Sequence, residues 1–541
     1  MRSSLPSVLA IVFAWVLCVI HAALLRDSTE QVEQDFSTVP SLKLHVMLKG
    51  KNVQIHGQSV FDVFAKPVVS NGNTELRYDG FSSFVEGDTK FMYTVVNGVS
   101  YVVEKTRGKK TSAATPSVRC YSSGIPFGDM LSSLNKAVAI PSASVNGEQI
   151  RCPYGSLYQT SLGDADFVLC ASGASGFTVY GIDMTVDVEY LSRPIKNIST
   201  LTPGINVDAC PVVIIPTTVT PTATALLTGE AISSTSARNL QESEPAEIKS
   251  DTCECKSTPR PCIFLHGSGN PTEEAELQDT PKLTKRKYGE MGDHAPCCTT
   301  IKYAVLNTND RGWTNATLQQ KYCDFSLSMS NSSDLSTRTV SDTIVVTHSM
   351  GGLVMAGAIA NGMCKFAKST SWVSLSPPMA GTMAADYIQD LCDGNITGLK
   401  IDMMDMLGLV KCPASTSRKY LGYQNGNHTT PALNAAYNAA QKAYRKNVYA
   451  AICSRTYRGV LSNYYAKCVI GGKMIPHKSK ENDGLVEFES CLGGLDAGLF
   501  GNSYRDRFYA GKLNHADTAF LTRDGIFSDA QKPFKWFECL L

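Results

Sequence analysis

The sequence predicts two folded parts: an antiparallel β-rich N-terminal domain and, after a linker, a C-terminal α/β domain with a mostly parallel sheet and helices on both faces. Three observations carry this prediction. Alternating segments fill residues 24–212, a Thr-, Pro- and Ser-rich stretch spans residues 213–260, and apolar runs separated by helical segments fill residues 261–541. Alternation is typical of sheets with one solvated face, whereas continuous apolar runs are typical of strands buried on both faces.

The first 23 residues have the organisation of a secretory signal peptide. Arg2 supplies a positive start, residues 5–20 are almost wholly apolar, and Ala22 and Ala23 offer small residues for cleavage. A transmembrane anchor is the alternative, but spanning a bilayer takes about 20 apolar residues, more than this run supplies. We therefore expect residues 1–23 to be removed and the mature protein to be secreted and extracellular.

Cysteine usage indicates the same compartment. The chain has 18 cysteines, and 18 − 1 = 17 remain once Cys18 leaves with the signal peptide. Because exported proteins pair most of their cysteines, we expect disulfides and one thiol left over. No cysteine group has the spacing of a zinc site. Two bridges within the N-terminal domain could use its four early cysteines, Cys120, Cys152, Cys170 and Cys210.

N-glycosylation sequons and overall charge limit the environment and the partners that we expect for the protein. The sequons predict exposed, modified loops in an exported chain. Net charge is +1, so there is no global field to attract nucleic acid or an acidic membrane. We expect no nucleic-acid partner, no cofactor and no bound metal. The sequence does not indicate the oligomeric state. The sequon asparagines are Asn197, Asn315, Asn331, Asn395 and Asn427.

Residues 24–212 predict an antiparallel sheet because several segments alternate between apolar and polar side chains and are separated by turn residues. A curved sheet and a sandwich both fit this pattern. His45 and His56 lie in strand-like segments, so we expect structural roles for them and no catalytic site in this domain. The alternating segments are 42–48, 91–96, 99–103 and 178–188.

Residues 261–541 contain short apolar runs of the kind found in buried parallel strands. A long insertion, about 381–450, separates the fourth run from the fifth and ends in a strong helical pattern. We interpret this insertion as a helical cap over the active end of the sheet. The five predicted strands are 262–266, 303–307, 343–347, 372–375 and 467–471.

Ser349 is the predicted nucleophile. It follows the apolar run 343–347 and precedes a helical segment that begins with two glycines. A serine at such a strand–turn–helix junction exposes its hydroxyl on a tight turn, and the residues two before and two after it must be small. Gly351 meets this requirement, while Thr347 stands where glycine is usual. The motif predicts nucleophilic catalysis by a serine.

A loop of small residues, His266-Gly267-Ser268-Gly269, ends the first predicted strand of this domain. In an α/β hydrolase, one oxyanion donor lies in such a loop and the other is the N–H of the residue after the nucleophile. We therefore expect the N–H groups of Ser268 and Met350 to form the oxyanion hole. His266 precedes the nucleophile, so we expect a structural role for it.

The catalytic base should follow the serine and the acid in chain order. Three histidines come after Ser349. His515 is preferred, because it follows the strand-like segment 507–513, where a last strand should end. His428 lies in a sequon within the insertion, and His477 lies in a polar loop ahead of the acid, so both are weaker alternatives.

The catalytic acid should follow the predicted strand 467–471. Asp483 does so, and Gly484 behind it is typical of a turn. The stretch from Asp483 to His515 leaves room for one helix and one strand. Glu481, two residues earlier, is the less favoured alternative.

With these residues the C-terminal domain resembles secreted triacylglycerol lipases, especially bacterial ones. N-D-G-L-V at 482–486 and N-H-A-D at 514–517 resemble their last two catalytic motifs, and residues 265–269 and 347–352 resemble their oxyanion and elbow motifs. The resemblance covers only residues from about 260 to 541. It implies an α/β-hydrolase fold and a Ser349–Asp483–His515 triad that acts on carboxylic esters.

The resemblance also raises the question of calcium. Some of these lipases hold a structural calcium ion through an aspartate two residues after the histidine, here Asp517, and a second aspartate upstream of the triad acid. No aspartate lies between residues 406 and 482 of this chain. We therefore do not predict a calcium ion.

The sequence thus predicts a secreted serine hydrolase that cleaves carboxylic esters, preferably lipid or acyl esters, through an acyl-enzyme. The alternatives are an acyltransferase that uses the same triad and a non-catalytic secreted binding protein. The expected partner is a small-molecule ester or lipid. A transient contact with a membrane or lipid surface is compatible with this prediction. The apolar segment 403–407 suits a lid over an apolar substrate, and an ordinary packed helix suits it equally.

Overall fold

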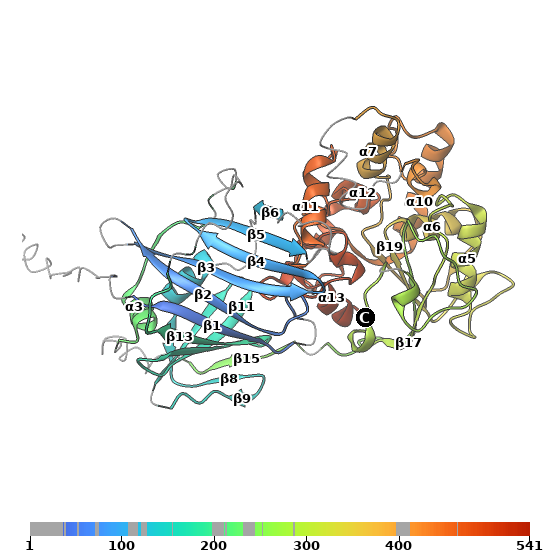
Figure 1. Ribbon diagram of the computed structural model, residues 1–541. Coiled ribbons are helices and arrows are strands. Elements are labelled where there is room, and N and C mark those ends of the chain that lie inside the picture. The colour runs from blue at the N-terminus through green and yellow to red at the C-terminus, as the bar shows by residue number, and fades with distance from the viewer. Residues whose placement is uncertain are drawn as a thin grey trace, which may run out of the picture.

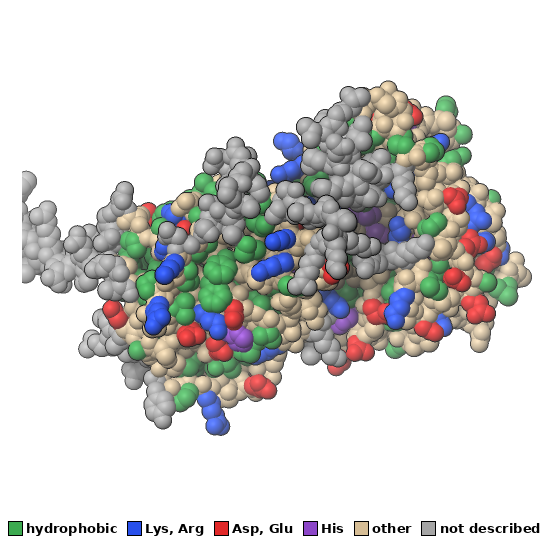
Figure 2. Space-filling view, viewed as in Figure 1, with side chains coloured by type: hydrophobic (Ala, Val, Ile, Leu, Met, Phe, Trp, Pro, Cys, Tyr) green, Lys and Arg blue, Asp and Glu red, His purple; other side chains and the backbone are tan. Residues whose placement is uncertain are grey.

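The computed structural model describes residue 36 and residues 39–541, except 51–52, 71–74, 107–116, 121–126, 154, 197, 199–209, 211, 213, 231–243, 252, 285–286, 397–411 and 463. Figure 1 shows two bodies side by side, a β-rich body in blue to green and an α/β body in yellow to red. The predicted signal peptide, the sequon Asn197 and the predicted lid segment 403–407 lie outside the described residues. On the face drawn in Figure 2, acidic and basic side chains are interspersed.

The β-rich body is built on one antiparallel sheet, which has twelve strands in the described part of the chain. Eleven strands follow the order β6-β5-β4-β3-β2-β1-β13-β12-β11-β10-β7, and β14 pairs with β3. The strands are β1 Ser41–Leu48, β2 Val60–Val69, β3 Glu75–Glu86, β4 Thr89–Val96, β5 Val99–Thr106, β6 Ser117–Cys120, β7 Val138–Ile140, β10 Ser156–Leu162, β11 Ala165–Ala171, β12 Gly176–Tyr180, β13 Met184–Leu191 and β14 Thr217–Thr218.

Alternation places one face of this sheet in a core. In β1, Leu44 and Val46 are buried while Lys43 and His45 are partly exposed, because successive side chains point to opposite faces. Two helices pack on the buried face, α2 Phe127–Asn135 and α3 Pro221–Thr228.

Part of the predicted linker 213–260 is folded onto this domain, so its interpretation as a bare linker is wrong there. Thr220 caps α3 by accepting from the N–H of Ala223, and Leu226 and Leu227 are buried in the sheet core. Further along, β15 Ala246–Ile248 joins a small sheet with β8 Ala143–Val145 and β9 Glu148–Gln149. A Thr- and Pro-rich composition hid a short helix, because threonine and proline are favoured at a helix start.

The α/β body is built on a seven-stranded sheet in the described residues, with order β17-β16-β19-β21-β22-β24-β23 and parallel pairing throughout. A separate parallel pair joins β18 Thr339–Val340 to β20 Lys365–Phe366. The seven strands are β16 Arg260–Leu265, β17 Cys298–Tyr303, β19 Ile344–His348, β21 Ser371–Leu375, β22 Val448–Ile452, β23 Phe500–Gly501 and β24 Phe508–Tyr509.

Helices cover both faces of this sheet. Along β16, Ile263 and Leu265 belong to a core that also contains residues of α5 Ala316–Leu327, α6 Met350–Ala360 and α10 Pro431–Asn447. Cys262 and Phe264 belong to the opposite core, under α13 Pro533–Cys539. The remaining helices are α7 Met383–Cys392, α9 Thr416–Lys419, α11 Tyr465–Met474 and α12 Phe488–Leu492, with short 3-10 turns η4 Pro281–Thr284, η5 Gly292–His294, η6 Ala497–Leu499, η7 Asp517–Ala519 and η8 Asp529–Gln531.

Two predicted strands differ from the structure. The run 303–307 shares only Tyr303 with β17, which ends there, and the run 467–471 is not a strand. Residues 467–471 lie inside the helix α11, and the strand that follows β21 in the sheet is β22, which the sequence interpretation missed. A short apolar run such as Cys468-Val469-Ile470 does not by itself distinguish a helix from a buried strand. The predicted acid therefore follows a helix and not a strand.

The predicted cap is also corrected in part. Helix α10 lies between the neighbouring parallel strands β21 and β22, and its buried Tyr437, Ala440 and Tyr444 pack with α6 on the sheet face. It is therefore a crossover helix of the sheet rather than a cap, since parallel strands need such a connection. The predicted insertion also contains α7 and α9, which are not the crossover helix.

Disulfides and sequons agree with an exported chain. The described residues form eight disulfides and leave Cys468 as a free thiol. Such a density of bridges fits an oxidising, extracellular environment. The described sequon asparagines are all exposed: Asn315, Asn331, Asn395 and Asn427. Within the described residues, no helix combines the length and apolarity needed to cross a membrane.

Candidate active site

Ser349 lies at the junction between β19 and α6, with φ of 54° and ψ of −132°. A non-glycine residue in this region of φ/ψ space is strained, and such strain collects at functional sites. The turn also brings the helix close to the neighbouring strand. A Cβ on Gly351 would lie 2.7 Å from the carbonyl oxygen of Leu265, so only glycine fits two residues after the serine.

Thr347 occupies the other side of this turn without disturbing it. Its side chain is fully buried, and its Oγ1 accepts a hydrogen bond from Trp372 Nε1 at 2.9 Å. A second contact joins Thr347 Oγ1 to Ser374 Oγ at 3.5 Å. The hydroxyl is thus satisfied by residues of β21, which explains how threonine is tolerated where glycine is usual.

The loop after β16 packs directly on the serine. A Cβ on Gly267 would lie 2.6 Å from Ser349 Cβ and 3.1 Å from Ser349 Oγ. The backbone of this loop is fixed by hydrogen bonds. The carbonyl oxygen of Gly267 accepts from Thr308 Oγ1 at 2.7 Å and bonds His266 Nδ1 at 2.9 Å, and the N–H of Gly269 donates to the carbonyl oxygen of Thr308.

The two predicted oxyanion donors are Ser268 and Met350. Among the described residues, no acceptor takes the N–H of Ser268, whose hydroxyl contacts Ser417 Oγ at 2.7 Å. Met350 is the first residue of α6, where the N–H has no partner within the helix. Ser268 follows Gly267 and Met350 follows Ser349, and the Gly267 and Ser349 backbones are in close contact, so the two N–H groups remain the candidates for an oxyanion hole.

Lys287 also contacts this loop, and no sequence motif pointed to it. Its Nζ donates to the carbonyl oxygen of Ser268 at 2.9 Å. Burial, together with the nearby positive charge of Arg418, lowers the pKa of Lys287 to about 8. A cation at this point both fixes the Ser268 peptide and raises the local positive potential near the serine.

His266 behaves as a structural residue. It is buried, and its Nε2 accepts from the N–H of Leu306 at 3.1 Å. With Nε2 accepting, Nδ1 carries the proton and donates to the carbonyl oxygen of Gly267. Burial lowers the pKa of His266 to about 4, so the ring stays neutral.

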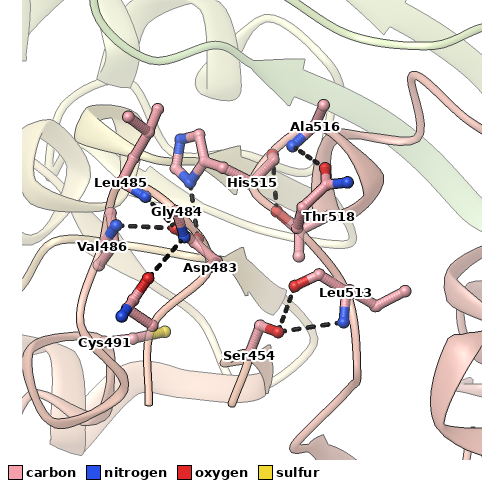
Figure 3. A network of polar contacts seen from close by, with 12 residues as sticks. Ser454, Asp483, Gly484, Leu485, Val486, Cys491, Leu513, His515, Ala516 and Thr518 are labelled. Atoms are coloured by element: carbon pink, nitrogen blue, oxygen red, sulfur yellow. Dashed lines mark hydrogen bonds and ion pairs between the residues drawn. The ribbon is translucent and has the colours of Figure 1, made fainter. Parts of the chain in front are cut away.

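Asp483 and His515 form a hydrogen-bonded pair (Figure 3), with Asp483 Oδ2 2.7 Å from His515 Nδ1. The other carboxylate oxygen accepts from the N–H groups of Leu485 at 2.9 Å and Val486 at 2.7 Å. A backbone hydrogen bond from His515 N–H to the carbonyl oxygen of Asp483 ties the two loops together. The carboxylate is buried, while the imidazole is partly exposed.

The surroundings of Asp483 favour its charged form. Burial alone would raise its pKa, but His515 and the backbone N–H groups of Val486 and Leu485 outweigh it and lower the pKa. A carboxylate accepting from Nδ1–H leaves Nε2 of His515 as the ring nitrogen that can take a proton. This is the arrangement of an orienting acid and a general base.

His348 connects this pair to the serine. Its ring lies 4.6 Å, centroid to centroid, from the ring of His515, and its Nε2 donates to the carbonyl oxygen of His515 at 3.2 Å. His348 directly precedes Ser349, so the loop that carries His515 contacts the residue next to the serine. Among the described residues, no hydrogen bond joins Ser349 Oγ to His515, and such bonds are often longer before substrate binds.

The alternative acid and bases have other partners. His428 Nε2 bonds Asp390 Oδ1 at 2.9 Å, and His477 Nδ1 bonds Glu487 Oε1 at 2.6 Å. Glu481 receives both of its contacts from Arg455 Nη1, at 2.9 and 3.0 Å. Every histidine after the serine therefore has a carboxylate, and contact with the serine turn distinguishes His515.

Asp517, which the resemblance connects with calcium, is fully buried. Its Oδ2 accepts from the N–H groups of Asn514 at 2.7 Å and Val460 at 2.9 Å, and its Oδ1 accepts from Thr522 Oγ1 at 2.7 Å. Burial raises the pKa of Asp517 to about 7. Its oxygens hold three loops together, and the described residues contain no group of three or more acidic, His or Cys side chains placed to bind a metal.

Comparison with known proteins gives little beyond this geometry. No protein-family model matches the chain, and no curated protein matches it. One solved structure, described as the structure of lipase 1 from Pelosinus fermentans, is similar with 13% sequence identity and a TM-score of 0.28, covering 52% of this chain and 97% of that chain. A similarity of this size leaves the function to be argued from the site.

Proposed function

We propose that the C-terminal domain is an α/β hydrolase that cleaves carboxylic esters through an acyl-enzyme on Ser349. The single observation that supports this most is the hydrogen-bonded Asp483–His515 pair, whose histidine packs on His348, the residue before a serine on a strained strand–helix turn. The parallel sheet with helices on both faces is the scaffold that this chemistry uses elsewhere. Lipid or acyl esters are the proposed substrates.

In the proposed reaction, His515 Nε2 takes the proton of Ser349 Oγ as the oxygen attacks the ester carbonyl carbon. The N–H groups of Ser268 and Met350 bind the negative oxygen that forms. His515 then gives the proton to the leaving alcohol, and an acyl-Ser349 ester remains. Water, activated by the same nitrogen, attacks this ester and releases the acid. Asp483 holds the ring in the required tautomer throughout.

A fluorophosphonate probe tests the nucleophile. The wild-type protein should be labelled at Ser349, as mapped by peptide mass spectrometry, and Ser349→Ala should be secreted and folded yet unlabelled. His428→Gln is the matched control for His515→Gln, since both histidines bond a carboxylate. Labelling should be lost in His515→Gln and kept in His428→Gln. Undiminished labelling of Ser349→Ala would sink the proposal.

A substrate panel tests the reaction. p-Nitrophenyl esters of increasing chain length should be hydrolysed by the wild type and not by Ser349→Ala. Product analysis with water and an alcohol in competition separates a hydrolase from an acyltransferase, because the acyl group ends on different acceptors. If neither labelling nor turnover occurs with a folded wild-type protein, a non-catalytic binding role is supported instead.

A further inference from the structure

The β-rich domain contains a cavity that the proposed chemistry does not use. It has a volume of about 120 Å³ and lies between the buried face of the antiparallel sheet and helix α2. Leu44 of β1, Leu169 of β11 and Val188 of β13 line it on the sheet side, and Leu134 lines it on the helix side. No charged side chain is among its lining residues.

Three lining residues have a hydroxyl group, and two of these hydroxyls donate a hydrogen bond while the third has no partner. Thr160 Oγ1 donates to the carbonyl oxygen of Ser133 at 2.5 Å, and Ser133 Oγ donates to the carbonyl oxygen of Asp129 at 2.9 Å. The hydroxyl of Tyr78 is buried and has no hydrogen-bond partner among the described residues. A buried hydroxyl without a partner costs about 1–3 kcal/mol, so a ligand that accepts from it gains affinity.

The size and chemistry of the cavity restrict its occupant. A cavity of about 150 Å³ lined by apolar side chains binds benzene in a well-studied case, so a volume of about 120 Å³ gives room for a short apolar group. The uncharged lining excludes a carboxylate, since burying an unpaired charge is costly. One hydroxyl without a partner among otherwise apolar or already bonded lining side chains suits a ligand with an aliphatic body and one neutral oxygen.

We propose that this cavity is a binding site for the aliphatic chain of a neutral lipid-like molecule, a fatty alcohol or a fatty acyl ester, whose oxygen accepts from the Tyr78 hydroxyl. The site is separate from Ser349 and does not depend on the proposed reaction. One residue of the α/β body also lines it: Phe527, whose carbonyl oxygen accepts from the N–H of Asp164 at 3.0 Å. An occupant therefore contacts both parts of the chain.

Calorimetric titration of the full secreted chain with 1-octanol, benzene and octanoate tests the proposal. 1-Octanol and benzene should bind, and octanoate should bind at least about tenfold more weakly because its charge is not compensated. Tyr78→Phe should weaken 1-octanol binding about three- to tenfold, the loss of one hydrogen bond, and leave benzene binding unchanged. Equal affinities for octanol in Tyr78→Phe and wild type would overturn the role of the hydroxyl.

Two size variants test the cavity itself. Val179→Phe, at a lining position, should fill it and abolish binding of both neutral ligands. Val60→Phe adds the same volume at a position that is 52% exposed, and should bind as wild type does. Far-UV circular dichroism and Tm establish that each variant is folded. Should Val179→Phe fail to fold, Phe527→Ala, which enlarges the cavity, should admit a larger aromatic such as p-xylene that wild type binds less tightly.

Binding that survives in a folded Val179→Phe variant, or p-xylene binding that Phe527→Ala does not strengthen, overturns the assignment of the site to this cavity. Repeating the titrations on Ser349→Ala separates this site from the proposed active site. Binding at the cavity should not change, whatever the outcome of the esterase assays.

Discussion

The ring of His348 lies against the ring of His515, and His348 Nε2 donates a hydrogen bond to the carbonyl oxygen of His515 at 3.2 Å. Because His348 directly precedes Ser349, one side chain positions the loop of the base relative to the serine turn. Burial and the neighbouring His515 hold the pKa of His348 well below its usual range, so the ring is neutral. We therefore expect His348 to act as a positioning residue rather than as a second base.

Replacing His348 should separate positioning from chemistry. His348→Phe keeps a ring against His515 but loses the hydrogen bond, and we expect kcat on a p-nitrophenyl ester to fall about tenfold with little change in KM. His45→Phe, on the partly exposed face of β1, is the matched control and should leave kcat unchanged. An unchanged kcat in a folded His348→Phe variant would contradict this role.

Asp483→Asn should remove the orientation of the base while keeping the fold. The amide cannot accept from His515 Nδ1–H and the backbone N–H groups as the carboxylate does, so the wrong tautomer is favoured and kcat should fall roughly 10⁴-fold. Asp390→Asn alters the His428 pair in the same way and should leave kcat near wild type. Steady-state kinetics on purified, folded variants measures both, and similar losses in the two variants would argue against the assignment.

Thr347→Gly restores the usual small residue before the serine, and it should not improve the enzyme. The change removes the acceptor of Trp372 Nε1 and leaves a buried void, so we expect the free energy of unfolding to fall by about 1–3 kcal/mol. Activity per folded molecule should stay the same or fall. Chemical denaturation and active-site titration measure the two quantities, and a more active, equally stable variant would show that Thr347 constrains the turn.

Lys287 should support activity below its pKa of about 8, where its Nζ is charged. Loss of that charge as pH rises through 8 weakens the hydrogen bond from Lys287 Nζ to the Ser268 carbonyl oxygen. We expect kcat of the wild type to fall between pH 7 and pH 9.5, while Lys287→Met is about tenfold slower at pH 7 and lacks this fall. Lys287→Arg, which stays charged, should retain activity to higher pH.

The same lysine should affect stability in the opposite sense. Its pKa is lower in the folded state than the ordinary 10.5, so the folded state disfavours the charge, and this penalty is largest below pH 8 and disappears as pH rises toward 10.5. Lys287→Met should therefore raise Tm at pH 7 more than at pH 10. A lower Tm at pH 7 would mean that the Ser268 contact outweighs the burial penalty.

Asp517 should make stability depend on pH. Its folded-state pKa of about 7 lies above the ordinary 3.8, so its contribution to stability is present at low pH and is lost as pH rises through 7. Asp517→Asn is neutral at every pH, and its Tm relative to wild type should increase from pH 5 to pH 8. Asp166→Asn, at an exposed position, should show no such trend. A difference in Tm that does not change with pH would contradict the raised pKa.

The candidate site could be proposed from the sequence largely because its signals are local or ordered along the chain. The turn at Ser349 needs small residues at fixed offsets, and the order of serine, acid and histidine left few choices for the rest. The choice of Asp483 depended on a strand at 467–471 that is in fact the helix α11. The pairing with His515 thus rests on chain order and not on the strand count.

Other features had no signal that one sequence could carry. Lys287 reaches the Ser268 carbonyl from a loop 19 residues away, and nothing in its neighbourhood distinguishes it from an exposed lysine. The strand β22 is a short apolar run after a helix, which does not differ in pattern from the run in α11. In the N-terminal domain, alternation predicted strands, but the pairing of β1 with β13 joins segments far apart in the sequence.

The disulfide between Cys253 and Cys539 joins residues 286 positions apart and encloses the whole α/β body in one covalent ring. The N-terminal and C-terminal ends of that body are therefore covalently joined to each other. A protease that cuts any one peptide bond inside the ring opens it without releasing a fragment. Such a nicked molecule should migrate as a single species until a reductant is added, and only then separate into two chains.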